Sequence, residues 1–191
     1  MLDASQEGKN MNRVVIRNPM AIVSTEWLAS RLNDRDIRIF DCTTILNKDE
    51  TGQKPYIVEN CRSDHDAGHI PGAGYLNIKS DFSSPGSPFS MTLPEPEQIA
   101  SAFGRCGISN SSKVILYSRR GMTWSTRFWW MLKSIGFENA SILDGGFDKW
   151  QIEKRPISTD PCQYPTGTLT VSPQPGTFVG KAEVLSAIGD K

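Results

Sequence analysis

A short polar loop between two apolar segments carries the residues best suited to chemistry. It follows the apolar run VILY (114–117) and precedes a segment with large apolar residues at helical spacing. Backbone N–H groups of such a loop, together with the first turn of a helix, form a cradle for an anion. We therefore predict an anion-binding loop, the alternative being that its arginines are solvated residues beside an ordinary turn. The residues of the loop are Ser118, Arg119, Arg120, Gly121, Met122 and Thr123.

A second polar segment, CRSDHDAGHIPG (61–72), combines residue types that bind metals. Cys61, His65 and His69 stand four residues apart, with two aspartates between them. Zinc motifs that use histidines at this spacing need a continuous helix, and Gly68 with Pro71 argues against one here. We therefore predict that this segment binds no metal, and the sequence implies no cofactor.

The four cysteines are scattered without a C-x-x-C pair, at Cys42, Cys61, Cys106 and Cys162. A chain of this size can bury a core without disulfides, so we expect reduced thiols. Cys42 at a strand end and Cys61 beside Arg62 could be partly activated. For all four, however, we expect ordinary packing or unreactive surface thiols.

The elements that must position these residues alternate between strand and helix patterns. Short apolar runs predict strands at 21–24, 37–41, 73–78, 114–117 and 140–146. Helix patterns begin at Ser24, at Leu93 and at Thr123, and a last short helix begins at Phe147. Residues 42–72 are predicted to be mostly loop. The alternation predicts an α/β fold with a central parallel sheet of about five strands and helices on both faces.

Outside residues 21–157 the composition changes. Residues 1–20 form a polar N-terminal extension. Five prolines between positions 156 and 175 predict an extended linker over 158–180. The stretch KAEVLSAIGDK (181–191) restarts a helix pattern, and we expect it to be the truncated start of a second domain.

Composition and charge exclude several classes of partner. The chain of 191 residues has 21 basic and 21 acidic residues, so its formal net charge is zero. Nucleic acids and anionic membranes attract a net cationic surface, so neither is expected as a partner. No apolar run approaches the roughly 20 residues of a membrane span, and the N-terminus lacks a signal-peptide pattern. We expect a cytoplasmic protein.

Four segments stand out in order along the chain. They are VSTEWLASRLNDRDIRIFDC (23–42), GHIPGAGYLNI (68–78), LYSRRGMTWSTRFWWML (116–132) and LDGGFDKW (143–150). Together they resemble the rhodanese family of sulfurtransferases. The likeness is to the amino-terminal domain of the two-domain form, which acts on thiosulfate or 3-mercaptopyruvate. It implies a rhodanese-like domain over 21–157 and a second rhodanese-like domain as its partner.

Ser118 stands where the active domain of that family has a cysteine. The chemistry needs a thiolate that attacks a sulfane sulfur, holds it as a persulfide and passes it to cyanide or a thiol. A hydroxyl cannot carry a persulfide, so we expect this chain alone to be inactive. Natural degeneracy of a first domain is the favoured explanation, and replacement of a native cysteine is the alternative. A stand-alone domain that binds an anion or a protein remains a third reading.

The resemblance also suggests roles for residues outside the loop. Asp41 and His69 are expected to hold loops at the sheet edge by hydrogen bonds. Arg127, with the two loop arginines, is a candidate for attracting a small anionic sulfur donor. The aromatic residues of 124–130 are expected in the core and at a domain interface. Without the second domain, an exposed apolar patch could drive dimerisation.

Overall fold

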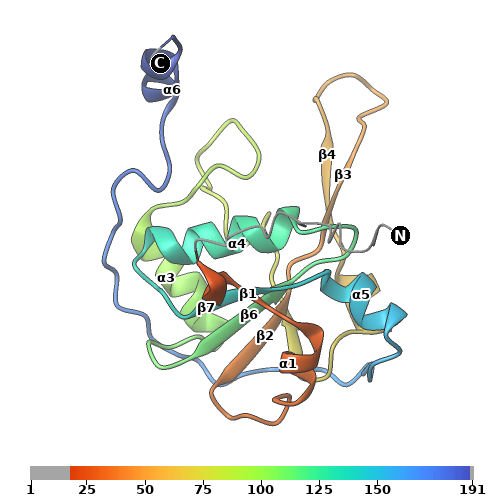
Figure 1. The fold of residues 1–191 in the computed structure, drawn as a ribbon. Coiled ribbons are helices and arrows are strands. Elements are labelled where there is room, and N and C mark those ends of the chain that lie inside the picture. The colour runs from red at the N-terminus through yellow and green to blue at the C-terminus, as the bar shows by residue number, and fades with distance from the viewer. Residues whose placement is uncertain (1–17, 190–191) are drawn as a thin grey trace, which may run out of the picture.

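A five-stranded parallel sheet forms the centre of the molecule (Figure 1). The computed structural model describes residues 18–189. The strand order is β1-β7-β6-β2-β5, and every neighbouring pair is parallel. The strands are β1 (Ile22–Val23), β2 (Ile37–Asp41), β5 (Ala73–Tyr75), β6 (Lys113–Tyr117) and β7 (Ala140–Leu143). The predicted fold class and all five predicted strands are confirmed.

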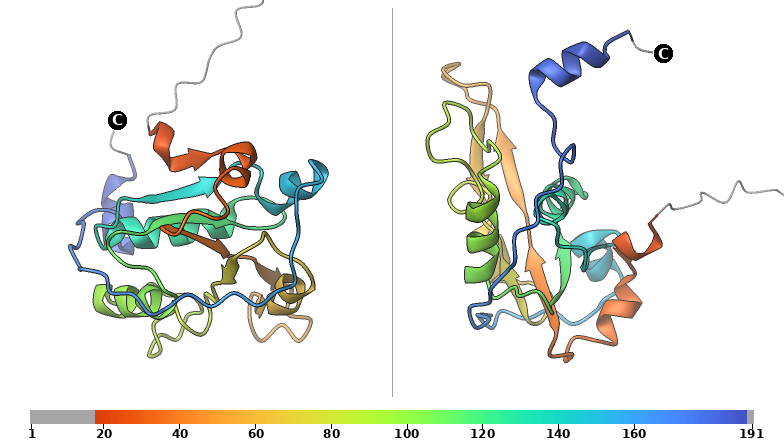
Figure 2. Two further views of the ribbon diagram at one scale, coloured as in Figure 1. Left: turned by 90° about the horizontal axis from the view of Figure 1, so that it is seen from below. Right: turned by 90° about the vertical axis from the view of Figure 1, so that its left-hand side faces the viewer.

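Helices cover both faces of this sheet, as predicted (Figure 2). On one face lie α3 (Pro96–Arg105) and α4 (Thr123–Ser134), and on the other lie α1 (Thr25–Ala29) and α5 (Gly146–Ile152). Successive residues of a strand point to opposite faces. Val114 and Leu116 of β6 therefore belong to the core under α3 and α4, while Ile115 and Tyr117 belong to the other core.

The prediction that residues 42–72 are mostly loop misses three regular elements. This segment contains an antiparallel hairpin, β3 (Thr44–Asn47) and β4 (Ile57–Asn60), which stands out from the body (Figure 1), followed by α2 (Arg62–Ala67). The hairpin buries few apolar side chains, and α2 is a six-residue polar helix. Neither element has the apolar periodicity on which a sequence-based prediction depends.

Residues 158–174, predicted as part of a linker, form a strap that is hydrogen-bonded to the domain. Ser158 pairs with His69 in an isolated antiparallel bridge. Further along, the amides of Gly167, Ser172 and Gln174 donate to carbonyl groups at the ends of α3 and α4. The proline-rich segment is extended, as predicted, but its polar groups are satisfied by the domain rather than by solvent alone.

Beyond the strap, α6 (Lys181–Ala187) begins where the sequence predicts a helix. Its residues are all exposed, including Val184 and Leu185. The predicted N-terminal extension lies largely outside the described residues, because the description begins at Asn18. Within residues 18–189, the helices are too short and too polar to cross a bilayer.

Candidate functional site

The candidate site lies at the carboxyl ends of β2 and β6. These strands pair in parallel with Asp41 opposite Tyr117, so both chains leave the sheet at the same edge. The side chain of Asp41 is fully buried there. Its Oδ1 accepts a hydrogen bond from the Thr43 amide at 2.9 Å and another from the Thr43 hydroxyl. This local turn holds the carboxylate under the loop that follows β6.

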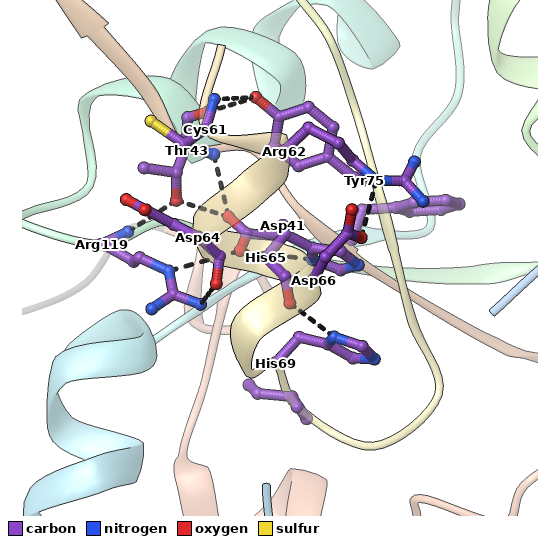
Figure 3. Close-up of polar contacts among 12 residues, drawn as sticks. Asp41, Thr43, Cys61, Arg62, Asp64, His65, Asp66, His69, Tyr75 and Arg119 are labelled. Atoms are coloured by element: carbon purple, nitrogen blue, oxygen red, sulfur yellow. Dashed lines mark hydrogen bonds and ion pairs between the residues drawn. The ribbon is translucent and has the colours of Figure 1, made fainter. Parts of the chain in front are cut away.

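The second oxygen of Asp41 faces two groups that can carry positive charge (Figure 3). Oδ2 lies 3.5 Å from Nδ1 of His65 and 3.6 Å from Nε of Arg119. Burial opposes ionisation of the carboxyl, but the contacts with His65 and Thr43 and the charge of Arg119 outweigh it. The pKa of Asp41 is therefore held below its ordinary value.

Arg119 is turned into the protein rather than toward solvent. Its Nη2 donates to the carbonyl oxygen of Asp64 at 3.1 Å and to that of Gly68. The guanidinium carbon also lies 3.9 Å from the ring centroid of Phe147. With these partners, the Arg119 side chain ties the end of α2 to the loop after β6. Arg120 differs from it, because its side chain is exposed.

Ser118 is buried, and its hydroxyl points inward. The Ser118 Oγ donates to the carbonyl oxygen of Gly121 at 2.7 Å. Gly146 closes over the same residue with a φ of +55°, and a Cβ added there would lie 2.3 Å from the Ser118 carbonyl oxygen. The glycine pair that begins α5 is therefore required for the close approach of α5 to the loop.

Two amides of the predicted anion cradle already have acceptors. The Arg119 amide donates to the Thr43 hydroxyl at 3.1 Å, and the Arg120 amide donates to the Asp148 carboxylate at 2.8 Å. By contrast, α4 begins after Met122 without a side-chain cap. An external anion could therefore bind to donors at the start of α4 but not to the amides of Arg119 and Arg120.

A cavity of about 250 Å³ lies between β3 and this loop. Arg120, Gly121 and Thr123 line it from one side, and Thr44 lines it from the other. The Thr44 hydroxyl is buried and has no hydrogen-bond partner within the described part of the chain. The cavity thus combines an exposed cation, a helix start and an unpaired hydroxyl.

Arg127 belongs to a different cavity, of about 440 Å³, on the outer side of α4. Its Nη2 donates to the Met91 carbonyl oxygen at 3.1 Å, and its guanidinium lies over the ring of Phe178. Burial lowers the pKa of Arg127. Trp130 also lines this cavity. Arg127 does not line the 250 Å³ cavity beside Arg120, although Thr123 and Trp124 line both cavities.

The four cysteines are all free, and burial raises the pKa of each thiol. The pKa of Cys106 is raised to about 11. Cys61 lies at the start of α2, where the neighbouring Asp64 and Asp41 oppose formation of a thiolate and the two loop arginines favour it. Burial dominates, so none of these thiols has the lowered pKa of a reactive nucleophile.

His69 and His65 stack against each other, with ring centroids 4.1 Å apart. His69 bridges two carbonyl oxygens, those of His65 and Asp160. Cys61 caps the start of α2 and does not join the histidines in a ligand set. In residues 18–189, no three His, Cys, Asp or Glu side chains are arranged to hold a metal ion.

Sequence reasoning missed Thr43, Asp148 and His65. The Asp-x-Thr spacing of 41–43 is a signal for a side-chain turn, and it could have identified Thr43. Asp148 lies 28 residues from the amide that it accepts, and no local pattern indicates that contact. The sequence suggests only a metal-ligand role for His65.

Comparison with known proteins agrees with this geometry. Residues 24–153 match the family model of the rhodanese-like domain. The chain is 31% identical to 3-mercaptopyruvate sulfurtransferase of Escherichia coli K12, over 86% of this chain and 56% of that protein. It is 30% identical to thiosulfate sulfurtransferase of Gallus gallus, over 75% of this chain and 48% of that protein.

The fold matches that of the sulfurtransferase SseA from Escherichia coli with a TM-score of 0.74 and 30% identity. That match covers 89% of this chain and 62% of the SseA chain. The chain thus spans about half the length of the curated relatives it matches. It belongs to the rhodanese-like domain family and is related to sulfurtransferases.

Proposed function

We propose that this chain supplies the non-catalytic domain of a sulfurtransferase that transfers sulfane sulfur from thiosulfate or 3-mercaptopyruvate to cyanide or a thiol. The observation that carries the proposal is the state of position 118. The residue there is a serine whose buried hydroxyl donates inward to Gly121, and a persulfide requires a sulfur that is open to the donor. The raised pKa of each of the four thiols supports the same proposal, because it disfavours the thiolate that a substitute nucleophile would need.

The surroundings of Ser118 favour natural degeneracy over loss of a native cysteine. The Asp148 carboxylate accepts from the Arg120 amide, where a catalytic loop would use such amides to stabilise a thiolate. A negative charge at this point raises the free energy of a neighbouring thiolate. The Asp148 carboxylate thus occupies one of the amide donors that would stabilise a thiolate at position 118.

Restoring the missing thiol tests this proposal. We expect Ser118→Cys to release no more thiocyanate from thiosulfate and cyanide than the unmodified chain, because the new thiol is buried and lacks a free cradle. Ser111→Cys, at an exposed position, controls for the addition of any thiol. Mass spectrometry after exposure to either donor should show no adduct of one sulfur atom. Brisk turnover by Ser118→Cys alone would show that Ser118 replaces a catalytic cysteine.

We further propose that the partner of this domain is a second rhodanese-like domain that packs on the outer side of α4. Trp130 is exposed on this side, and the exposed apolar residues of α6 follow Phe178 along the chain. The length of the relatives, about twice the matched part, supports a partner of this size. In its absence, two copies of the chain could cover the same apolar surface as a dimer.

A small-anion site is a second candidate function, favoured by the cavity beside Arg120. Its exposed cation, helix start and unpaired Thr44 hydroxyl suit a compact oxyanion such as thiosulfate. Calorimetry should detect thiosulfate binding that weakens about tenfold in Arg120→Ala, the equivalent of about 1.4 kcal/mol. Arg105→Ala removes an exposed arginine elsewhere and should bind as the unmodified chain does. Equal affinity of all three proteins would eliminate this site.

A further inference from the structure

Helix α6 stands apart from the sheet domain (Figures 1 and 2). It has seven residues, Lys181–Ala187, and every one of them is exposed. Isolated helices shorter than about 12 residues are marginal in water, and most helices in proteins are stabilised by packing of an apolar face. A helix as short as α6 therefore needs a packing partner, and the domain described here does not cover it.

The apolar side chains of this segment lie on one side of the helix. Because a helix turns by about 100° per residue, Val184, Leu185 and Ile188 form a stripe about 100° wide. All three are more than half exposed. Glu183 lies at one edge of this apolar stripe. Lys181 lies on the same side in the first turn, where its long side chain can keep the ammonium group in solvent.

The cavity of about 440 Å³ on the outer side of α4 has the complementary character. Trp124, Trp130 and Phe178 give it three aromatic walls. Arg127 also lines it, half-buried, with its Nη2 donating to the Met91 carbonyl oxygen. Within residues 18–189, no carboxylate forms an ion pair with Arg127. The cavity thus suits an apolar helix face with an acidic side chain at its edge.

The chain between this cavity and α6 is too short for the helix to fold back easily. Phe178 lines the cavity, and α6 begins only three residues later. Gly180, the residue before the helix, is extended with φ −83° and ψ 169°. Docking of α6 in the cavity of its own chain would require a reversal within Val179 and Gly180. A second copy related by a two-fold axis meets no such constraint, because each copy offers both a helix and a cavity.

We propose that two copies of this chain exchange α6, so that the apolar stripe of each helix fills the 440 Å³ cavity of the other copy, with Glu183 beside Arg127. The proposal rests on the part of the proposed function that places a partner on the outer side of α4. It names the element that fills the cavity there. Docking of α6 in its own cavity, and coverage of this surface by a separate domain alone, are the competing outcomes.

Sedimentation velocity of the unmodified chain over a wide range of concentration tests the association. We expect an equilibrium between monomer and dimer. Leu185→Ser removes an apolar contact from the helix, and Trp130→Ala removes one wall of the cavity. Each should raise the dissociation constant about tenfold or more. Ile152→Ser changes an 81% exposed residue of α5 and should leave the constant unchanged. A monomer at every concentration, or equal weakening by all three substitutions, would overturn the proposal.

Mixing the two weakened variants tests the exchange itself. A mixed dimer of Leu185→Ser and Trp130→Ala contains one interface in which an intact helix meets an intact cavity. The mixture should therefore contain more dimer than either variant alone at the same total concentration. No gain on mixing would show that α6 does not enter the cavity of the other copy. The thiocyanate assay of Ser118→Cys reports on position 118 whatever the state of association, so failure of the exchange is distinguishable from failure of the proposed function.

Discussion

Replacing Asp41 by alanine is expected to lower the free energy of unfolding by about 3–5 kcal/mol, the range for breaking a buried charge pair from one side. The carboxylate holds Thr43 through two hydrogen bonds and faces both His65 and Arg119. Without it, the mostly buried Arg119 guanidinium loses its counter-charge. Urea denaturation at pH 7 measures the change. Asp66→Ala removes a half-exposed carboxylate that pairs with the exposed Arg62, and should change stability by less than about 1 kcal/mol.

The pH dependence of the Asp41 effect has a definite sign. Because its pKa is lower in the folded protein than in the unfolded chain, Asp41 stabilises the fold fully above about pH 4, the ordinary range of an aspartate. This contribution is lost as pH falls through the lower folded value. The stability difference between the unmodified chain and Asp41→Ala should therefore narrow on acidification. A difference that widens as pH falls would contradict the assignment.

Replacing Trp150 by alanine is the second change with a large expected effect, a loss of about 3–5 kcal/mol. Its ring is completely buried in the core beneath α1 and α5, and its Nε1 donates to the Pro156 carbonyl oxygen at 2.7 Å. The substitution creates a cavity and releases the chain just before the strap. Thermal and urea unfolding measure the loss, and hydrogen exchange at Ser158 should speed up as well.

Trp130→Ala is the matched control for this loss. The Trp130 ring is 47% exposed, so its removal should cost less than about 1 kcal/mol. Similar losses for the two variants would mean that the core under α5 is not the main source of stability on that face of the sheet.

The sequence is informative about the sheet because each of its strands is a short apolar run. VILY predicts β6, and IRIFD predicts both β2 and the delivery of Asp41 to its carboxyl end. The loop after β6 is therefore placed correctly from the sequence alone. Helix α4 is equally predictable from the sequence. Large apolar residues recur along it at helical spacing, and Gly136, which follows it, has the positive φ that favours glycine after a helix.

The electrostatic state of the loop could not be predicted in the same way. The contact of Asp148 with the Arg120 amide, and the inward turn of the Arg119 side chain, depend on how α5 and α2 pack at the sheet edge. Local spacing carries no information on such contacts, because they are set by tertiary packing. The same reason explains why the sequence predicts a linker where the structure has the hydrogen-bonded strap.

The strap also changes where an autonomous folding unit can be cut. A chain ended after residue 157 would keep every strand and helix of the sheet domain. The carbonyl oxygens of Gly104 and Ile135, however, would lose the hydrogen bonds that the amides of Gly167 and Ser172 donate to them. The backbone of Gly107 and Ile108 would also lose its contacts with Tyr164 and Gly167. Expression boundaries drawn from the sheet alone would thus remove part of the folded domain, and a usable fragment must extend at least to Gln174.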